Sequence, residues 1–176
     1  MEFQQVILVN EQDQPRGSME KIAAHQKGLL HRAFSIFIFN SKGELLLQQR
    51  AANKYHSGGL WTNSCCSHPQ PGEETIIAAQ RRLKEEMGFT TPLEKIFDFV
   101  YRAEFSNGLT EHEFDHVFAG NYEGVIEFNK DEVMDYCYRS LPDIRNSLEK
   151  YPEKFSKWFI LAFPKIEEWW RSNKNE

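Results

Sequence analysis

Apolar residues gather in short runs that favour β-strands along most of the chain. The runs are rich in aliphatic and aromatic side chains, as strands usually are. Turn residues separate them at 11–17 (EQDQPRG), 41–43 (SKG) and 106–108 (SNG). The second of these turns predicts a hairpin between the strands on either side of it. The predicted strands are residues 5–10, 33–40, 44–50, 96–105, 113–122 and 135–139.

Helical spacing is clearest over residues 73–87, where acidic residues begin the segment and Gly88 follows it. A shorter helix is predicted at 142–151, and a third at 157–171 with a kink near Pro164. Strands, a central helix, more strands and final helices indicate an α+β fold, an α/β sandwich with a mixed sheet flanked by helices. Residues spaced three or four apart define the apolar face of the central helix: Ile76, Ala79, Leu83 and Met87.

Composition narrows the classes of function. A chain of 176 residues with 14% aromatic side chains predicts one ordered domain over residues 1–176. Residues 158–163 form the longest strongly apolar stretch, which is too short to cross a membrane, and residues 1–5 do not resemble a signal peptide. The net charge is −5 with no basic stripe, which disfavours a nucleic-acid partner. An anionic ligand would need a few local Lys or Arg residues or a bound metal.

The three cysteines include an adjacent pair, Cys65 and Cys66. Neighbouring cysteines rarely form an unstrained disulfide, so we expect free thiols and a reducing cytoplasm. Cys66 and His68 lie two residues apart, and an extended backbone would turn both side chains toward one wall of a cleft. Taken alone, the same spacing also suits a buried cysteine beside a surface histidine.

A second group of polar residues could hold a cation. Glu111 and Glu113 face the same way in a strand and would repel each other unless a cation or a proton lay between them. His25 and His31 come from an earlier loop or helix end. Each feature alone also fits an ordinary solvated surface. Together with His68, these residues suit a five- or six-coordinate Mn²⁺, Zn²⁺ or Mg²⁺, with the imidazoles favouring the first two.

The central helix carries a further acidic candidate. Arg81 and Arg82 precede Glu85 and Glu86 by four residues, which predicts surface ion pairs worth a few tenths of a kcal/mol each. Glu86 also lies beside the apolar face, three residues after Leu83. An acidic residue at that buried edge is a candidate ligand for a second cation.

The motifs WTNSCCSHP and EHEFDHVF, with His25 and His31, resemble the type 1 isopentenyl-diphosphate isomerases over residues 6–170. That family resembles the nudix hydrolases in fold, with a mixed sheet between helices. Two departures from the nudix signature G-x5-E-x7-R-E-U-x-E-E-x-G-U, with U aliphatic, matter here. Ser67 replaces the opening glycine, and Arg82 replaces a glutamate of the metal-binding cluster. The lost carboxylate disfavours diphosphate hydrolysis.

The resemblance implies a role for each motif residue. It implies Cys66 as the catalytic thiol, Tyr101 as the active-site tyrosine and Trp158 as the aromatic facing the hydrocarbon. Glu86, with the backbone carbonyl of Cys66, would hold the Mg²⁺ that accompanies the diphosphate. The implied ligands of the other metal are His25, His31, His68, Glu111 and Glu113, and the implied diphosphate contacts are Lys21, Arg50, Lys54 and Arg82.

The implied reaction moves the double bond of a small isoprenoid diphosphate through a tertiary carbocation. Glu113, with Tyr101 as relay, and Cys66 would form the acid and base pair, whose direction the sequence leaves open. Trp158 and Trp61 are candidates for the aromatic face that stabilises the cation. Three other interpretations stay open: a nudix-type hydrolase, a non-catalytic metal-binding module and a Cys–His hydrolase. The oligomeric state and the identity of the histidine-bound metal are open as well.

Overall fold

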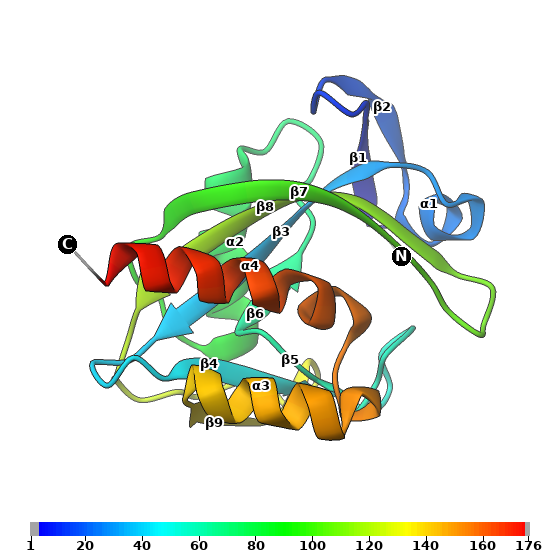
Figure 1. Ribbon diagram of the computed structural model, residues 1–176. Coiled ribbons are helices and arrows are strands. Elements are labelled where there is room, and N and C mark those ends of the chain that lie inside the picture. Colours follow the sequence, from blue (N-terminus) through cyan, green and yellow to red (C-terminus); the bar gives the residue numbers. More distant parts are fainter. Residues whose placement is uncertain (1–3, 175–176) are drawn as a thin grey trace.

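A single mixed sheet forms the centre of the molecule (Figure 1). The computed structural model describes residues 4–174. Four α-helices and a short 3₁₀ turn surround the sheet in the described residues. The helices are α1 (Lys21–Lys27), α2 (Thr75–Met87), α3 (Leu141–Lys150) and α4 (Lys157–Asn173), and the 3₁₀ turn is Pro152–Lys154. The strands are β1 (Gln5–Val9), β2 (Pro15–Glu20), β3 (His31–Phe39), β4 (Leu45–Arg50), β5 (Trp61–Thr62), β6 (Cys65–Ser67), β7 (Glu94–Glu104), β8 (Thr110–Asn121) and β9 (Val133–Arg139).

Strand β3 organises the sheet. It pairs in parallel with β8 and antiparallel with β6, so those two strands lie on opposite sides of it. The hairpin predicted between β3 and β4 has a single register pair, Phe39 with Leu45. Beyond that point the two strands separate, because β4 pairs with β9 and β5. β7 and β8 correspond to the two strands predicted on either side of the turn at 106–108, and they form a long antiparallel hairpin.

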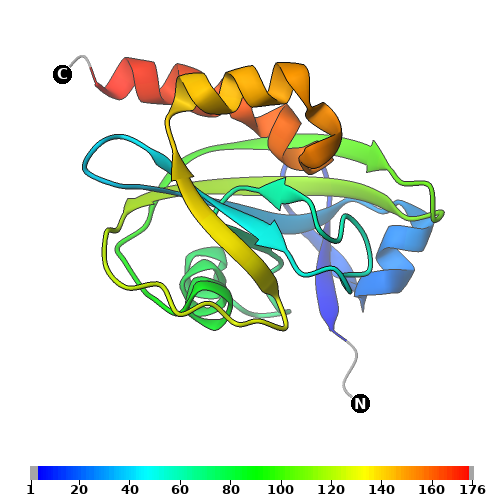
Figure 2. The ribbon, with the colours of Figure 1, turned by 90° about the horizontal axis from the view of Figure 1, so that it is seen from below.

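The alternation of side chains along β3 builds two cores. Phe34, Ile36 and Ile38 face α2, whereas Phe37 and Phe39 face α3 and α4. Figure 2 shows the result, with α3 and α4 over one face of the sheet and α2 against the other. Nearly continuous burial, with side chains alternating between the two faces, is what a strand covered on both faces requires. The predicted α+β sandwich is therefore confirmed.

Two local expectations change. α2 begins at Thr75, so Glu73 and Glu74 precede its first turn; Glu73 instead receives a hydrogen bond from Arg81 Nε at 2.8 Å. The turn after β1 is shorter than predicted, because β2 begins at Pro15 and pairs back onto β1. α4 runs continuously with Pro164 inside it, and the kink near this residue stays a prediction.

α1 is an element that the sequence analysis did not assign. Glu20 caps its first turn by accepting hydrogen bonds from the backbone N–H groups of Ile22 and Ala23. Gly28 ends it in the left-handed conformation, at φ 64°. α1 packs against β8. Within residues 4–174, no helix is both long and apolar enough to span a membrane.

Candidate active site

A line of polar side chains crosses the sheet near α1. In the register of the strands, Glu113 on β8 lies between Tyr101 on β7 and His31 on β3. Glu111, two residues earlier on β8, faces the same way. The Tyr101 hydroxyl lies 2.7 Å from Glu113 Oε2 and 2.8 Å from Glu111 Oε2. Its one proton is therefore placed between two carboxylates.

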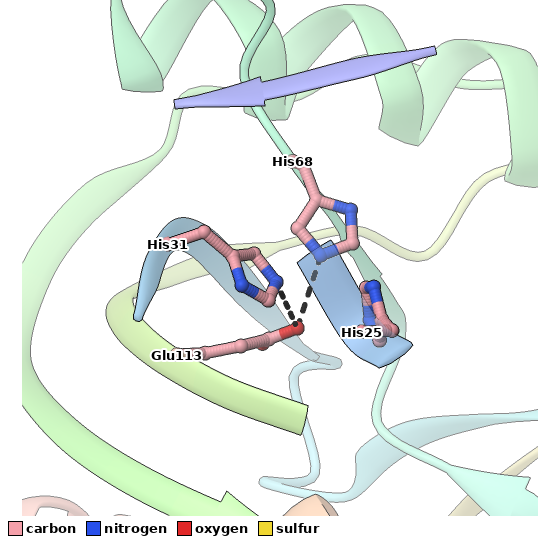
Figure 3. Close-up of side chains that lie close together, drawn as sticks. All are labelled: His25, His31, His68 and Glu113. Carbon is pink, nitrogen blue, oxygen red and sulfur yellow. Dashed lines mark hydrogen bonds and ion pairs between the residues drawn. The ribbon is translucent and has the colours of Figure 1, made fainter. Parts of the chain in front are cut away.

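Three histidines surround Glu113 (Figure 3). His68, just after β6, has its Nε2 3.0 Å from Glu113 Oε1, and His31 Nε2 lies 3.4 Å from the same oxygen. His25 comes from α1, and its ring centre is 4.9 Å from that of His31. His25 and His31 are fully buried, and His68 and Glu113 nearly so. One potential ligand atom from each of the four residues falls within 4.8 Å of the others.

The backbone sets the tautomers of two of these rings. His25 Nδ1 lies 2.7 Å from the carbonyl oxygen of Lys21, and His31 Nδ1 lies 2.8 Å from that of Leu29. A carbonyl only accepts, so each Nδ1 is the donor, and in the neutral ring each Nε2 is left with a lone pair. Both Nε2 atoms are buried without a hydrogen-bond partner. This is the arrangement in which a histidine binds a metal through Nε2 while Nδ1 holds the ring in place.

The electrostatics favour a cation at the same point. Burial lowers the pKa of His25 and of His68 to about 4, so both rings are neutral at pH 7. Burial alone would raise the pKa of Glu113, but the neighbouring His31 and His68 hold it well below its usual range. Glu113 thus stays ionised among buried groups. The donor set, the orphaned nitrogens and the buried negative charge fit a divalent metal at the group formed by His25, His31, His68 and Glu113, whereas Glu111 belongs to a second group with His25 and His56.

The adjacent cysteines face opposite sides of the sheet. Cys65 is fully buried toward α2, where its Sγ lies 3.2 Å from Glu86 Oε2. Cys66 faces the α4 side and is half-buried; the Trp158 indole N–H donates to its Sγ at 3.1 Å. Burial raises the pKa of the Cys66 thiol, although the nearby Arg50 acts in the other direction. The thiol is therefore protonated at neutral pH.

Cys66 and Glu113 line the same narrow cavity, which we call the inner slot. Its volume is about 30 Å³, and aromatic rings close it on several sides. Burial, followed by the charges of Glu111 and Glu113, raises the pKa of Tyr101 well above its usual value, so its hydroxyl keeps its proton. The slot-lining residues are Arg50, Tyr55, His56, Cys66, Ser67, His68, Tyr101, Glu111, Glu113 and Trp158.

A larger polar cavity of about 360 Å³, the outer cavity, shares Arg50, Cys66 and His68 with the slot. Glutamates form ion pairs with two of its basic side chains, Lys54 and Arg82. Lys54 pairs with Glu132, and Arg82 pairs with Glu86 at 2.8 Å and with Glu85 at 2.5 Å. The basic residues predicted to contact a diphosphate all line it: Lys21, Arg50, Lys54 and Arg82.

Glu86 is buried at the inner edge of the outer cavity. Its Oε1 accepts from Arg82, and its Oε2 accepts from Gln48 Nε2 at 3.0 Å. The helical spacing predicted this position beside the apolar face of α2. The predicted i,i+4 pairs, Arg81–Glu85 and Arg82–Glu86, are both present.

Comparisons with known proteins identify the family. The sequence profile of the NUDIX domain matches residues 29–159. The isopentenyl-diphosphate Delta-isomerase of Pectobacterium atrosepticum is 52% identical over 176 residues, covering 100% of this chain and 98% of that protein. Isopentenyl-diphosphate Delta-isomerase 2 of Aromatoleum aromaticum is 53% identical over 162 residues, with 92% and 86% coverage. The chain belongs to the isopentenyl-diphosphate Delta-isomerase family. The family resemblance given by the sequence motifs is therefore confirmed.

A solved structure supports the fold of this family member. The DR0079 protein of Deinococcus radiodurans superimposes with a TM-score of 0.78 at 18% sequence identity, covering 92% of this chain and 98% of that one. At that identity the likeness concerns the fold alone. It agrees with the sandwich of helices and mixed sheet described above.

One residue expected in this isomerase-family site lies elsewhere. Trp61 on β5 lines a separate cavity with Leu47, Cys137 and Phe155, and lines neither the inner slot nor the outer cavity. Its backbone carbonyl accepts from Ser156 N at 2.9 Å, and its ring packs against the core beneath α3 and α4. The neighbouring position, Thr62, faces the other way and is fully buried. We therefore withdraw Trp61 as a substrate contact.

Tyr55 and His56 also line the slot of this family member, although no sequence pattern predicts them there. Both lie in the loop between β4 and β5. His56 Nε2 approaches Glu111 Oε1 to 2.8 Å, and Tyr55 stacks edge-on against His25 at 5.5 Å. No spacing pattern relates these loop residues to α1 or β8, because only the folded loop brings them together. A histidine within a Gly-rich turn was the one available signal.

Proposed function

We propose that this protein converts isopentenyl diphosphate to dimethylallyl diphosphate by moving one proton onto the alkene and removing another. The main supporting observation is that a thiol and a carboxylate, Cys66 and Glu113, line one aromatic slot that opens into a basic cavity. Their strands, β6 and β8, flank β3 on opposite sides. This placement suits proton exchange at two carbons that lie on either side of the branch carbon. The named activity of the relatives supports the same conclusion.

In the proposed reaction, the terminal alkene carbon gains a proton and the branch carbon becomes a tertiary cation. The adjacent methylene then loses a proton, and its C–H electrons form the new double bond. We assign Cys66 and Glu113 as the acid and base pair, with Tyr101 relaying a proton at the carboxylate. The reverse reaction exchanges their roles, so the pair rather than a direction is assigned.

The slot must protect the cation from water, which would trap it as an alcohol. Trp158 is 4% exposed. The hydrogen bond from its indole N–H to Cys66 Sγ holds the indole beside the thiol. A desolvated tryptophan face stabilises a cation by about 2 kcal/mol. The slot volume of about 30 Å³ is smaller than a five-carbon chain. We therefore expect aromatic side chains to move apart when substrate enters.

The outer cavity would hold the diphosphate. Lys21, Arg50, Lys54 and Arg82 would bind its oxygens, in competition with the glutamates that now pair with two of them. Because the diphosphate does not react, its binding can orient the hydrocarbon in the slot. Glu86 and the Cys66 carbonyl are the groups we assign to a Mg²⁺ that neutralises diphosphate charge.

The second metal would be held by His25, His31, His68, Glu111 and Glu113. When bound, a divalent cation there lowers the proton affinity of the carboxylates and fixes their orientation. Glu113 keeps its contact with Tyr101 through Oε2 while its Oε1 faces the histidines. The two oxygens thus separate a metal-facing side from a slot-facing side.

A cytoplasmic location stays a prediction from the free thiols Cys65, Cys66 and Cys137.

Incubation of isopentenyl diphosphate with the protein and Mg²⁺ in heavy water tests the proposal. We expect dimethylallyl diphosphate with deuterium in a methyl group and no release of phosphate. Release of phosphate or diphosphate, also tested on nucleoside diphosphates, would favour the hydrolase interpretation. No product at all, with substrate bound, would favour a non-catalytic module.

A further inference from the structure

His56 belongs to a loop whose backbone is tightly constrained. The loop leaves β4 and returns to it, with Gly59 N donating to Arg50 O at 3.0 Å and Arg50 N donating to Leu60 O at 2.9 Å. A Cβ on Gly58 would lie 2.4 Å from Ala52 O, so the turn closes only with glycine there. Arg50 Nη2 also donates to the His56 carbonyl at 3.2 Å. The position of His56 is thus fixed from both sides.

The imidazole of His56 is held among aromatic rings. It stacks on Phe105 with centroids 4.5 Å apart and an interplanar angle of 9°. Tyr55 and Trp158 meet it nearly edge-on, at 4.3 and 5.7 Å. His56 is 6% exposed. Packing of this kind leaves the ring little freedom except to present Nε2 toward the floor of the slot.

The Nε2 atom of His56 shares one property with the Nε2 atoms of His25 and His31. All three are buried without a hydrogen-bond partner. The Glu111 Oε1 atom is 2.8 Å from His56 Nε2, but the contact lacks the direction of a hydrogen bond. Potential ligand atoms of His25, His56 and Glu111 lie within 4.8 Å of one another, and His25 also belongs to the group around Glu113.

We propose that His56 is a sixth protein ligand of the metal centre, beside His25, His31, His68, Glu111 and Glu113. This inference rests on the metal centre of the proposed function. Neighbouring ligands of an octahedral ion with bonds of about 2.1 Å lie roughly 3 Å apart, which matches the separation of His56 Nε2 from Glu111 Oε1. Four imidazoles and two carboxylates would favour a transition metal such as zinc or iron over Mg²⁺.

The test uses the full chain, stripped of metal and loaded with Co²⁺. Paramagnetic NMR gives a strongly shifted ring N–H signal for each imidazole bound to Co²⁺. We expect four such signals, one each from His25, His31, His56 and His68. The H56Q variant should lose one signal and bind Co²⁺ at least about tenfold more weakly in competition with a chelator. The matched control is H116Q, because His116 is 8% exposed and bonds to Asp13 at 2.9 Å.

The outcomes separate the alternatives. Three signals in the unmodified protein, or an equal number in the unmodified protein and H56Q, would overturn the inference. Weaker Co²⁺ binding by H56Q without loss of a signal would place His56 outside the ligand shell, as a positioning residue for Glu111. If H56Q fails to fold, the count in the unmodified protein decides alone. Isomerase activity, measured separately, tests the proposed function whatever the signal count.

Discussion

The inner slot and the outer cavity share several lining residues but differ in chemistry. The slot is narrow, and buried groups that can exchange protons meet aromatic rings in it. The outer cavity has roughly twelve times the volume, from about 360 against about 30 Å³. Its lining includes five Lys and Arg side chains and three glutamates. The groups suited to proton transfer therefore gather in the inner slot, and those suited to anion binding gather in the adjoining outer cavity.

The sheet supplies the physical reason for this separation. Cys66, His68 and Arg50 lie at the boundary and line both spaces. From there β8 presents only acidic groups to the slot, whereas α2 presents Arg82 to the outer cavity. Substitutions in the slot should therefore change kcat, and those in the outer cavity should change KM. The following predictions test that division, beginning with the largest effect.

Replacement of Cys66 by serine should reduce kcat by about a thousandfold or more, because a positioned proton donor typically contributes factors of 10²–10⁴. The matched variant is Cys65→Ser, which alters a thiol that faces α2 and Glu86. We expect it to retain most of the activity. Steady-state isomerisation of both variants is the measurement. Equal losses would show that the two faces of β6 are not functionally distinct.

Glu113→Gln should also lower kcat strongly, by about a hundredfold or more, since it removes the negative charge among His31, His68 and Tyr101. The control is Glu94→Gln, an exposed position on β7. Kinetics and metal content should be measured on the same samples. Similar losses in both variants would point to general destabilisation.

Lys54→Ala should raise KM about 10- to 100-fold with a smaller change in kcat. Loss of a charge-assisted hydrogen bond to the diphosphate costs about 1.5–3 kcal/mol. Lys84→Ala removes a charge of the same kind from the exposed side of α2 and should leave both constants unchanged. If Lys54→Ala mainly lowered kcat, the assignment of the outer cavity to binding would be wrong.

Trp158→Phe should lower kcat about tenfold, because phenylalanine keeps an aromatic face but stabilises a cation less well and lacks the N–H that contacts Cys66. Trp61→Phe should have the smallest effect, since Trp61 lies outside both spaces. Parallel kinetics with unfolding curves separate catalysis from stability. A drop in kcat for Trp61→Phe at unchanged stability would show that Trp61 does contribute to the active site.

Much of the architecture could be predicted from local patterns. The continuous apolar run of β3 and the helical spacing on α2 are properties of neighbouring residues, so the sequence displays them directly. The α1 helix was missed because its seven residues form a single short element with weak periodicity. Its stability comes from the Glu20 cap and from packing on β8.

The distinction between local sequence patterns and tertiary contacts also applies to the site. The i,i+2 spacing of Glu111 and Glu113 and the adjacent pair Cys65 and Cys66 specify relative orientation within one strand, whatever the rest of the chain does. Local spacing does not specify which side of the strand meets a cleft. The β3–β8 register brought Glu113 beside His31, and the order of β6, β3 and β8 brought Cys66 to the slot.

Local chemistry along the chain thus determined the strands, the central helix and the motifs that identify the family. Only the tertiary structure shows that Trp61 lies in a separate cavity and that His56 lines the slot. The reason is that both lie next to β4 in short segments without a repeating pattern, and their positions depend on loop closure around Gly58 and on contacts with distant strands. Sequence periodicity describes an element, whereas a site is formed by several elements meeting.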